Sequence, residues 1–309
     1  MLVLEKDFAG AQIAGARPYQ EDAQGFASLD EPAQIADVSP EESPSSPESV
    51  SAQNEPEVST LLVIVADGMG GENAGDFASR CVVDTFVDYC DRYARKDRVS
   101  AMLRSAMLAA NEALASAMDA NPELEGMGTT LLAIVVAEQS LHRVSVGDSP
   151  LYLYREGALT QINEDHSMMP LLIEQVKNGE LNEQDISSHP DRNVLRAAMT
   201  GEELELVDCP LEAIPLLPGD IVIVASDGIQ TLDEAAIKMR LDRHKNLSAE
   251  GITKKLLKAV VTEANPKQDN TSINVIRIPL PDDEDCQEDD EELKSKTRLI
   301  RRGSSPAVL

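Results

Sequence analysis

Basic residues are scarce in this chain of 309 residues. It has 27 Lys and Arg against 55 Asp and Glu, which gives a formal net charge of -28. A surface with that charge repels nucleic acid and anionic membranes, so we expect neither as a partner. No apolar run approaches the roughly 20 residues of a membrane-spanning helix. The hydrophobic fraction of 42% is still enough for a large core in one or two domains.

Cysteine is rare, and its spacing excludes the common zinc-site patterns and a disulfide scaffold. The four cysteines form no CxxC pair, so we expect reduced thiols and a cytoplasmic location. The first ten residues contain neither a basic stretch nor a long apolar one, so we expect no signal peptide. The cysteines are Cys81, Cys90, Cys209 and Cys286.

Several catalytic motifs are also missing. The sequence has no GxxxxGK[ST] phosphate loop, no GxSxG nucleophile elbow and, among its four histidines, no HExxH. This excludes the P-loop, α/β-hydrolase and HExxH zinc-protease mechanisms. His166 follows Asp165 and is a candidate acid or base, but a single histidine is more often structural, and we favour that reading.

The stretch VADGMGGENAG, residues 65–75, organises the rest of the chain. An apolar run over 61–65 predicts a buried strand, and it ends at Asp67-Gly68, with a glycine pair and a helix following. Glycine lets the backbone approach a ligand closely. A carboxylate beside a free carbonyl suits a hard cation such as Mg²⁺ or Mn²⁺. Asp-Gly alone is more often an ordinary turn pair.

The same design recurs at other strand ends. If strands of two sheets meet at one edge, these acids converge and repel one another unless divalent cations hold them. Two such ions bridged by water are a known solution for phosphoester hydrolysis. Arg17 is then a candidate phosphate clamp, or simply a surface arginine. The acids concerned are Glu21, Asp22, Asp67, Asp148, Asp227 and Asp269.

Periodicity and turn residues predict the remaining elements. Helices are expected over 74–89 and 99–114, after a capping box at 231–234, and from 248 to 263. On the first helix, Phe77 is among the residues expected to face the core. Strands are expected at 12–15, 23–28, 61–65, 129–137, 141–146, 151–154, 159–162, 220–225 and 271–278, with order also returning at 204–207.

Three segments differ from the rest. Residues 30–59 are rich in Pro, Ser and Glu and contain no Lys or Arg, which predicts a disordered insertion. Residues 169–203 are only weakly apolar, which indicates a functional flap. We expect one folded unit over 1–281, then a disordered tail over 282–309 that is first acidic and then basic. RRGSS at 301–305 is a candidate kinase target, although a solvated tail is the simpler reading.

Eight motifs in order carry a resemblance to a known family. The chain resembles the metal-dependent type 2C serine/threonine protein phosphatases (PPM family) in their bacterial form, from about residue 10 to about residue 280. The motifs are RPYQED (17–22), VADGMGG (65–71), GMGTTL (126–131), GDSPLYLYREG (147–157), NEDHS (163–167), RNVLRAAMTG (192–201), ASDG (225–228) and QDNTS (268–272).

The resemblance implies an α+β fold, in which two antiparallel sheets form a β-sandwich flanked by helices, with a dinuclear Mn²⁺ or Mg²⁺ site at one end. It makes 1–281 the phosphatase domain and 169–203 the mobile flap. Phosphoserine or phosphothreonine in proteins would be hydrolysed by in-line attack of a metal-bridging water. By this resemblance, Asp67 would bridge the two ions and Gly68 would be a ligand through its carbonyl. Asp227 and Asp269 would bind one ion, and Glu21, with Asp22 beside it, would bind the other. Asp148 would help to hold a third, weaker ion, and Arg17 would bind the phosphate.

Three departures from the family pattern stand out. Gln20 replaces an Asn that often precedes the two acids, and Pro150 replaces an Arg. Met69 stands where eukaryotic members carry a histidine proposed as general acid, whereas bacterial members usually have Met.

Two alternatives to a protein phosphatase remain open. One is a catalytically weak, phosphatase-like regulatory module that binds phosphoproteins or partners. The other is a hydrolase of small phosphoesters or cyclic nucleotides. The partners implied by the leading reading are phosphorylated Ser/Thr proteins, including a cognate kinase.

Overall fold

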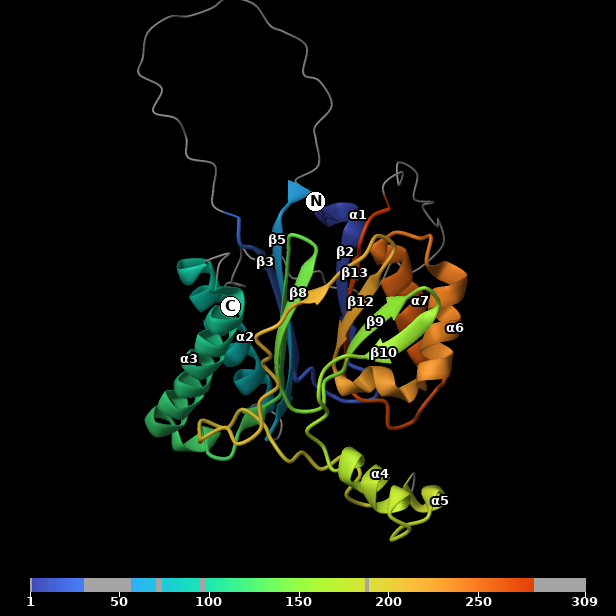
Figure 1. Cartoon of the computed structure of the whole chain (residues 1–309). Helices are drawn as coiled ribbons and strands as arrows, with labels where there is room; N and C mark the ends of the chain where they lie inside the picture. The colour runs from blue at the N-terminus through green and yellow to red at the C-terminus, as the bar shows by residue number, and fades with distance from the viewer. Residues whose placement is uncertain (1, 31–56, 71–73, 95–97, 187–188, 281–309) are drawn as a thin grey trace, which may run out of the picture.

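The chain forms two antiparallel sheets packed face to face between two helical layers (Figure 1). The computed structural model describes residues 2–30, 57–70, 74–94, 98–186 and 189–280. One sheet has five strands in the order β10-β9-β12-β13-β2, and the other has six in the order β11-β8-β7-β5-β3, with β6 paired to β5. This is the predicted α+β sandwich.

The elements have the following bounds. The strands are β1 (Leu2–Val3), β2 (Phe8–Ile13), β3 (Asp22–Ser28), β4 (Glu57–Val58), β5 (Thr60–Met69), β6 (Gly128–Thr129), β7 (Leu131–Ala137), β8 (Ser140–Val146), β9 (Leu151–Arg155), β10 (Ala158–Gln161), β11 (Ile214–Pro215), β12 (Ile221–Ala225) and β13 (Thr271–Arg277). The helices are α1 (Leu4–Asp7), α2 (Ala74–Tyr93), α3 (Val99–Ala120), α4 (Met169–Lys177), α5 (Glu183–Ile186), α6 (Glu234–His244) and α7 (Ala249–Thr262), with 3₁₀ turns η2 (Pro122–Leu124) and η3 (Asp227–Thr231).

The burial of strand β5 on both faces explains why its sequence is apolar without alternation. Leu61, Val63 and Val65 pack into the core between the two sheets. Leu62 and Ile64 point the other way, into the core under α2 and α3. Because side chains alternate across a strand, a strand covered on both faces must be apolar at every position. Strand β12 divides its residues in the same way between the inter-sheet core and the core under α6 and α7.

The topology brings the ends of six strands to one end of the sandwich. Asp22 opens β3 and is paired in register with Asp67, near the end of the antiparallel strand β5. Asp227 follows β12, and Asp269 precedes β13, which is antiparallel to β12. Asp148 lies between β8 and β9. The convergence expected from the sequence therefore follows from strand direction.

Several sequence predictions of local structure are wrong. The helix after η3 is capped by Asp233, which accepts from Ala236 N–H, so 231–234 is no capping box. Residues 204–207 form no strand, and the nearby pairing is a single bridge between Ser145 and Asp208. The first strand of the main sheets runs from Phe8 to Ile13 rather than over 12–15. On α2, Phe77 is 43% exposed, because the buried stripe runs through Val83 and Val87 instead.

The predicted insertion 30–59 leaves and re-enters the sandwich at one point. Leu29 N–H donates to the Thr60 carbonyl, and both the N–H and the hydroxyl of Ser59 donate to Asp30. At its end, residues 57–58 form β4 with β1, so the prediction of disorder is wrong there. The rest of the insertion and the tail 282–309 lie outside the described residues.

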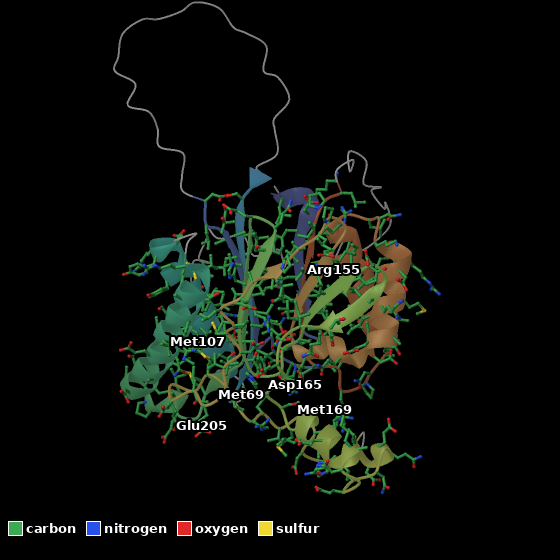
Figure 2. The ribbon with its side chains drawn as sticks, in the orientation of Figure 1. Met69, Met107, Arg155, Asp165, Met169 and Glu205 are labelled. Carbon is green, nitrogen blue, oxygen red and sulfur yellow. The ribbon has the colours of Figure 1, made fainter. Side chains whose placement is uncertain are left out.

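The predicted flap is an excursion that carries α4 and α5. Both helices project from the body at one end of the sandwich (Figure 1). In Figure 2, Met69 and Asp165 lie at that same end, and Met169 begins the excursion, whereas Arg155 lies away from it. The excursion and the ends of the acid-bearing strands therefore share one end of the molecule.

Candidate metal centre

A cleft of about 800 Å³ opens at this end. Its lining includes predicted site residues from five separate segments, together with the chain that returns from α5. The lining residues are Arg17, Glu21, Asp67, Gly68, Met69, Gly70, Thr130, Asp148, Asn193, Leu195, Arg196, Ala197, Ala198, Thr200, Glu202, Glu203, Leu204, Glu205, Asp227, Asp269 and Asn270.

Asp67 is fixed by the neighbouring Thr129-Thr130 pair. Its N–H donates to the Thr130 hydroxyl oxygen at 2.9 Å. Its carbonyl accepts from Thr130 N–H at 2.8 Å and from the Thr129 hydroxyl at 2.8 Å. The backbone of Asp67 is therefore fully engaged, which leaves only its carboxylate to act in the cleft.

Gly68 lies where no side chain fits. A Cβ at this position would overlap the carbonyl of Gly75 and approach the Glu21 carbonyl to 2.7 Å. Gly75 is in the first turn of α2, and a Cβ there would lie 2.6 Å from Glu21 Oε1. The Glu21 carboxylate thus lies close to the N-terminal end of a helix, where the helix dipole favours a negative charge.

Asp22 lies behind the cleft rather than in its lining. It is only 3% exposed, and its Oδ2 accepts hydrogen bonds from the hydroxyls of Ser226 and Ser272 at 2.7 and 2.8 Å. Ser272 belongs to β13 and Ser226 directly follows β12, so the carboxylate ties β3 to the other sheet. Its Oδ1 is buried without a hydrogen-bond partner.

The remaining predicted residues line the cleft. Arg17 forms an ion pair of 2.6 Å with Asp269, in which both side chains are partly exposed. Asp227 has a buried oxygen, Oδ1, without a hydrogen-bond partner. Asp148 lies in a loop whose Ser149 hydroxyl is 2.9 Å from that of Thr130.

Burial and mutual repulsion dominate the electrostatics. Burial raises the pKa of Asp67 well above its usual value, and the charges of Asp22, Asp227 and Asp148 raise it further. Burial likewise raises the pKa of Asp22 to about 7, against the hydrogen bonds from its two serines. It raises the pKa of Asp148 to about 8, with a contribution from Asp227. The protein alone thus holds these carboxylates in an unfavourable arrangement.

A divalent cation fits this donor set. Clustered carboxylates with partnerless oxygens, beside a glycine backbone that is open to close approach, are ligands for hard cations. Within the described part of the chain, no three His, Cys, Asp or Glu side chains are already arranged to hold one metal ion. The predicted set places three carboxylates, those of Asp67, Asp227 and Asp269, on one ion, so this ligand assignment stays a prediction.

Sequence reasoning missed the groups that support and enclose the acids. Asn270 accepts from Glu21 N–H at 2.7 Å and donates to the carbonyls of Ala14 and Tyr19. The sequence predicts the cleft wall from Asn193 to Glu203 only as part of a flap. The motif QDNTS contains Asn270, and RNVLRAAMTG covers the wall as far as residue 201, so their inclusion in the resemblance is the available signal.

The departures from the family pattern have visible structural settings. The Pro150 carbonyl accepts from Ala225 N–H at 3.2 Å, which joins the start of β9 to β12. Pro150 is the position at which the family often has an Arg. Met69 lines the cleft, and no histidine is among the described lining residues.

Comparisons with known proteins identify the family. A family model described as protein phosphatase 2C matches residues 49–262. The chain therefore belongs to the protein phosphatase 2C family.

Two bacterial relatives illustrate the similarity. The chain is 38% identical over 182 residues to the serine/threonine protein phosphatase PstP of Mycobacterium tuberculosis, which covers 58% of this chain and 34% of PstP. It is 30% identical over 221 residues to the serine/threonine phosphatase Stp of Listeria monocytogenes, covering 70% of this chain and 83% of Stp. The chain thus spans about a third of the length of PstP but most of Stp.

Solved structures confirm the fold. A crystal structure of PstP from Mycobacterium tuberculosis matches with a TM-score of 0.68 at 27% identity, over 88% of this chain and 98% of that one. The PstP catalytic domain in complex with two manganese ions matches with a TM-score of 0.64 at 25% identity, over 87% and 96%. No helix among the described residues is long and apolar enough to cross a membrane.

Proposed function

We propose that this protein is a metal-dependent phosphatase that hydrolyses phosphoserine and phosphothreonine in other proteins. The observation that carries the proposal is the convergence of acids from separate strand ends at one cleft, where Asp227 in the lining and Asp22 behind it each have a buried oxygen without a hydrogen-bond partner. Membership of the protein phosphatase 2C family supports the reaction class, and the two manganese ions in the PstP structure support a dinuclear site.

The chain's own residues would divide the work. When bound, two Mn²⁺ or Mg²⁺ ions would lower the pKa of water and neutralise charge on the phosphate. Asp67, the Gly68 carbonyl and Glu21 would hold one ion, and Asp67, Asp227 and Asp269 the other. Asp148 would help to hold a third, weaker ion. Asp22, behind the cleft, would orient these groups or complete their coordination.

Arg17 would bind and orient the phosphate. Its guanidinium contacts Asp269, so a small movement of the Arg17 side chain would bring it to a phosphate at the metal centre. Because no described lining residue is a histidine, the departing serine or threonine oxygen would take its proton from water. The cognate kinase as a partner and the cytoplasmic location remain predictions from the sequence.

Phosphate release from a phosphothreonine peptide tests the proposal. The purified protein should release phosphate with Mn²⁺ or Mg²⁺ and should stop when excess EDTA is added. No release by the folded protein with either metal, together with tight binding of the phosphopeptide, would contradict the proposal in favour of a regulatory module. Faster turnover of small phosphoesters than of phosphopeptides would instead indicate a small-molecule hydrolase.

A further inference from the structure

One short segment holds the loop that carries Asp148 from both sides. Asn163 accepts from Leu151 N–H at 2.8 Å and donates to the Ser149 carbonyl at 3.0 Å. His166 N–H donates to the Gly147 carbonyl at 3.0 Å, and Gly147 N–H donates to His166 Nδ1 at 3.2 Å. The motif NEDHS therefore forms hydrogen bonds with the backbone on both sides of Asp148.

The Nδ1 atom of His166 serves as a hydrogen-bond acceptor. His166 is 3% exposed, and burial lowers its pKa, which favours the neutral ring. Since Nδ1 accepts from Gly147, the proton of the neutral ring must be on Nε2, which lies 3.7 Å from Glu164. The Gly147 N–H is buried, so it has no water to replace this acceptor.

The loop cannot easily relax away from this contact. Gly147 has a φ of +110°, and a Cβ there would lie 2.7 Å from Thr130 Cγ2. The same Thr130 binds the N–H of Asp67 and the hydroxyl of Ser149. A shift of the loop would therefore also disturb the support of Asp67.

The backbone of His166 contacts the opposite wall of the cleft. Its carbonyl accepts from Arg196 N–H at 2.7 Å, and Met168 N–H donates to the Val194 carbonyl at 2.9 Å. Ser167 and Leu195 pair as an antiparallel bridge, which closes the base of the excursion carrying α4 and α5. Leu195 and Arg196 both line the cleft.

We propose that His166 is a positioning residue, which holds the Asp148 loop and the cleft wall at Leu195 and Arg196 in one fixed arrangement. It acts through Asp148 and touches neither metal nor substrate itself. The inference rests on the proposed function in one respect, namely that Asp148 helps to hold the weakest metal ion. Losing the acceptor at Nδ1 should loosen the loop and the wall together and weaken that ion.

Three variants of the full chain separate the acceptor from mere bulk. His166→Asn keeps an acceptor at the δ position, whereas His166→Leu fills a similar volume without one. His142→Leu is the matched control, because His142 is a partly buried strand histidine that contacts Ser100 and does not line the cleft.

The first measurement is hydrogen exchange in the metal-free protein. In His166→Leu, segments 145–151 and 193–198 should both exchange about tenfold faster, since a lost hydrogen bond to a buried group is worth about that factor. The second is a Mn²⁺ titration followed by the resonance of free Mn²⁺, in which the weakest ion should bind about tenfold more weakly. His166→Asn and His142→Leu should stay close to the wild type in both.

Two results would overturn the inference. One is a His166→Leu protein with wild-type exchange in both segments; the other is a His166→Asn protein as impaired as His166→Leu. If His166→Leu does not fold, His166→Gln takes its place, because its acceptor lies one bond too far from Gly147, and it should show the same loss. A wild type that binds no Mn²⁺ and releases no phosphate would refute the proposed function, whereas the exchange data would still decide on His166.

Discussion

At the scale of single residues, the cleft combines groups that destabilise one another. Burial raises the pKa of Asp227, and the charge of Asp269 raises it further. One oxygen of Asp227 has no partner within the described chain. Such a residue weakens the metal-free protein and becomes useful only when a cation is present, so its removal should have opposite effects on stability and on activity.

Asp227→Asn tests this directly. With Mn²⁺, phosphate release should fall by at least about 100-fold, because one charge is lost from the ligand set. In EDTA, the free energy of unfolding should rise by about 1 kcal/mol, because one charge repulsion disappears. The melting temperature should then rise by about 2–4 °C. Asp119→Asn, at an exposed position near the end of α3, makes the same charge change outside the cleft and should alter neither. Unchanged phosphate release in Asp227→Asn would remove Asp227 from the metal centre.

The acids could be predicted from the sequence, but their supports could not. Asp67, Asp148, Asp227 and Asp269 each stand beside a turn residue at a strand end, which is a local pattern. The contacts of Asn270 with Ala14 and Tyr19 join residues about 250 positions apart. A side chain that serves distant backbone has no local signature, so its role appears only in three dimensions.

At the scale of elements, β5 is the centre of the molecule. It contributes to two of the three hydrophobic cores, one on each face, and it ends at the cleft. Adjacent residues Leu61 and Leu62 are both fully buried but belong to different cores. This makes them a matched pair with identical chemistry.

Leu61→Ala and Leu62→Ala should therefore destabilise the protein alike. Each should lower the free energy of unfolding by about 2–5 kcal/mol, because each leaves a cavity in a closed core. Leu159→Ala, on the edge strand β10 and only partly buried, should cost clearly less. Guanidinium unfolding in EDTA, followed by circular dichroism, measures all three. A wild-type midpoint for either β5 variant would mean that one face of this strand is not closed.

The sequence predicted central elements better than peripheral ones, for a physical reason. Strands covered on both faces need an unbroken apolar run, and β5, β7 and β12 have one. Near 204–207 the strand-type backbone pairing is limited to one bridge at Asp208. The cap of α6 is Asp233 rather than Thr231, because several acids and hydroxyls compete at that turn. Such choices depend on differences too small for a pattern to decide.

At the scale of the whole molecule, the predicted insertion and the acids lie at opposite ends of the sandwich. The predicted insertion joins β3 and β5 at the end where Ser28 pairs with Leu61, whereas the acids lie at the end where Asp22 pairs with Asp67. The β3–β5 pair therefore separates the insertion's attachment point from the cleft. The boundaries of the domain and the nature of the tail stay predictions.

The raised pKa values of the acids make the stability of the whole metal-free protein depend on pH. The pKa of Asp22 is raised to about 7 and that of Asp148 to about 8, so the folded protein keeps protons that the unfolded chain has lost above its ordinary carboxyl pKa of about 4. The stability that these protons provide is complete below about pH 4 and is lost as the pH rises through 7 and 8. Between the carboxyl pKa of the unfolded chain and that of the folded protein, each such group lowers the free energy of unfolding by about 1.4 kcal/mol per pH unit.

In EDTA, the melting temperature should consequently fall as the pH rises from 5.5 to 8.5. Saturating Mn²⁺ should remove or reverse this trend, because cations bind the ionised carboxylates and displace the protons. Asp148→Asn should make the EDTA profile flatter, since one titrating group is gone, while Asp119→Asn should leave its slope unchanged. A metal-free profile that is flat, or that rises over this range, would mean that these carboxylates are already ionised without metal and that the cleft is not the strained, proton-holding site described above.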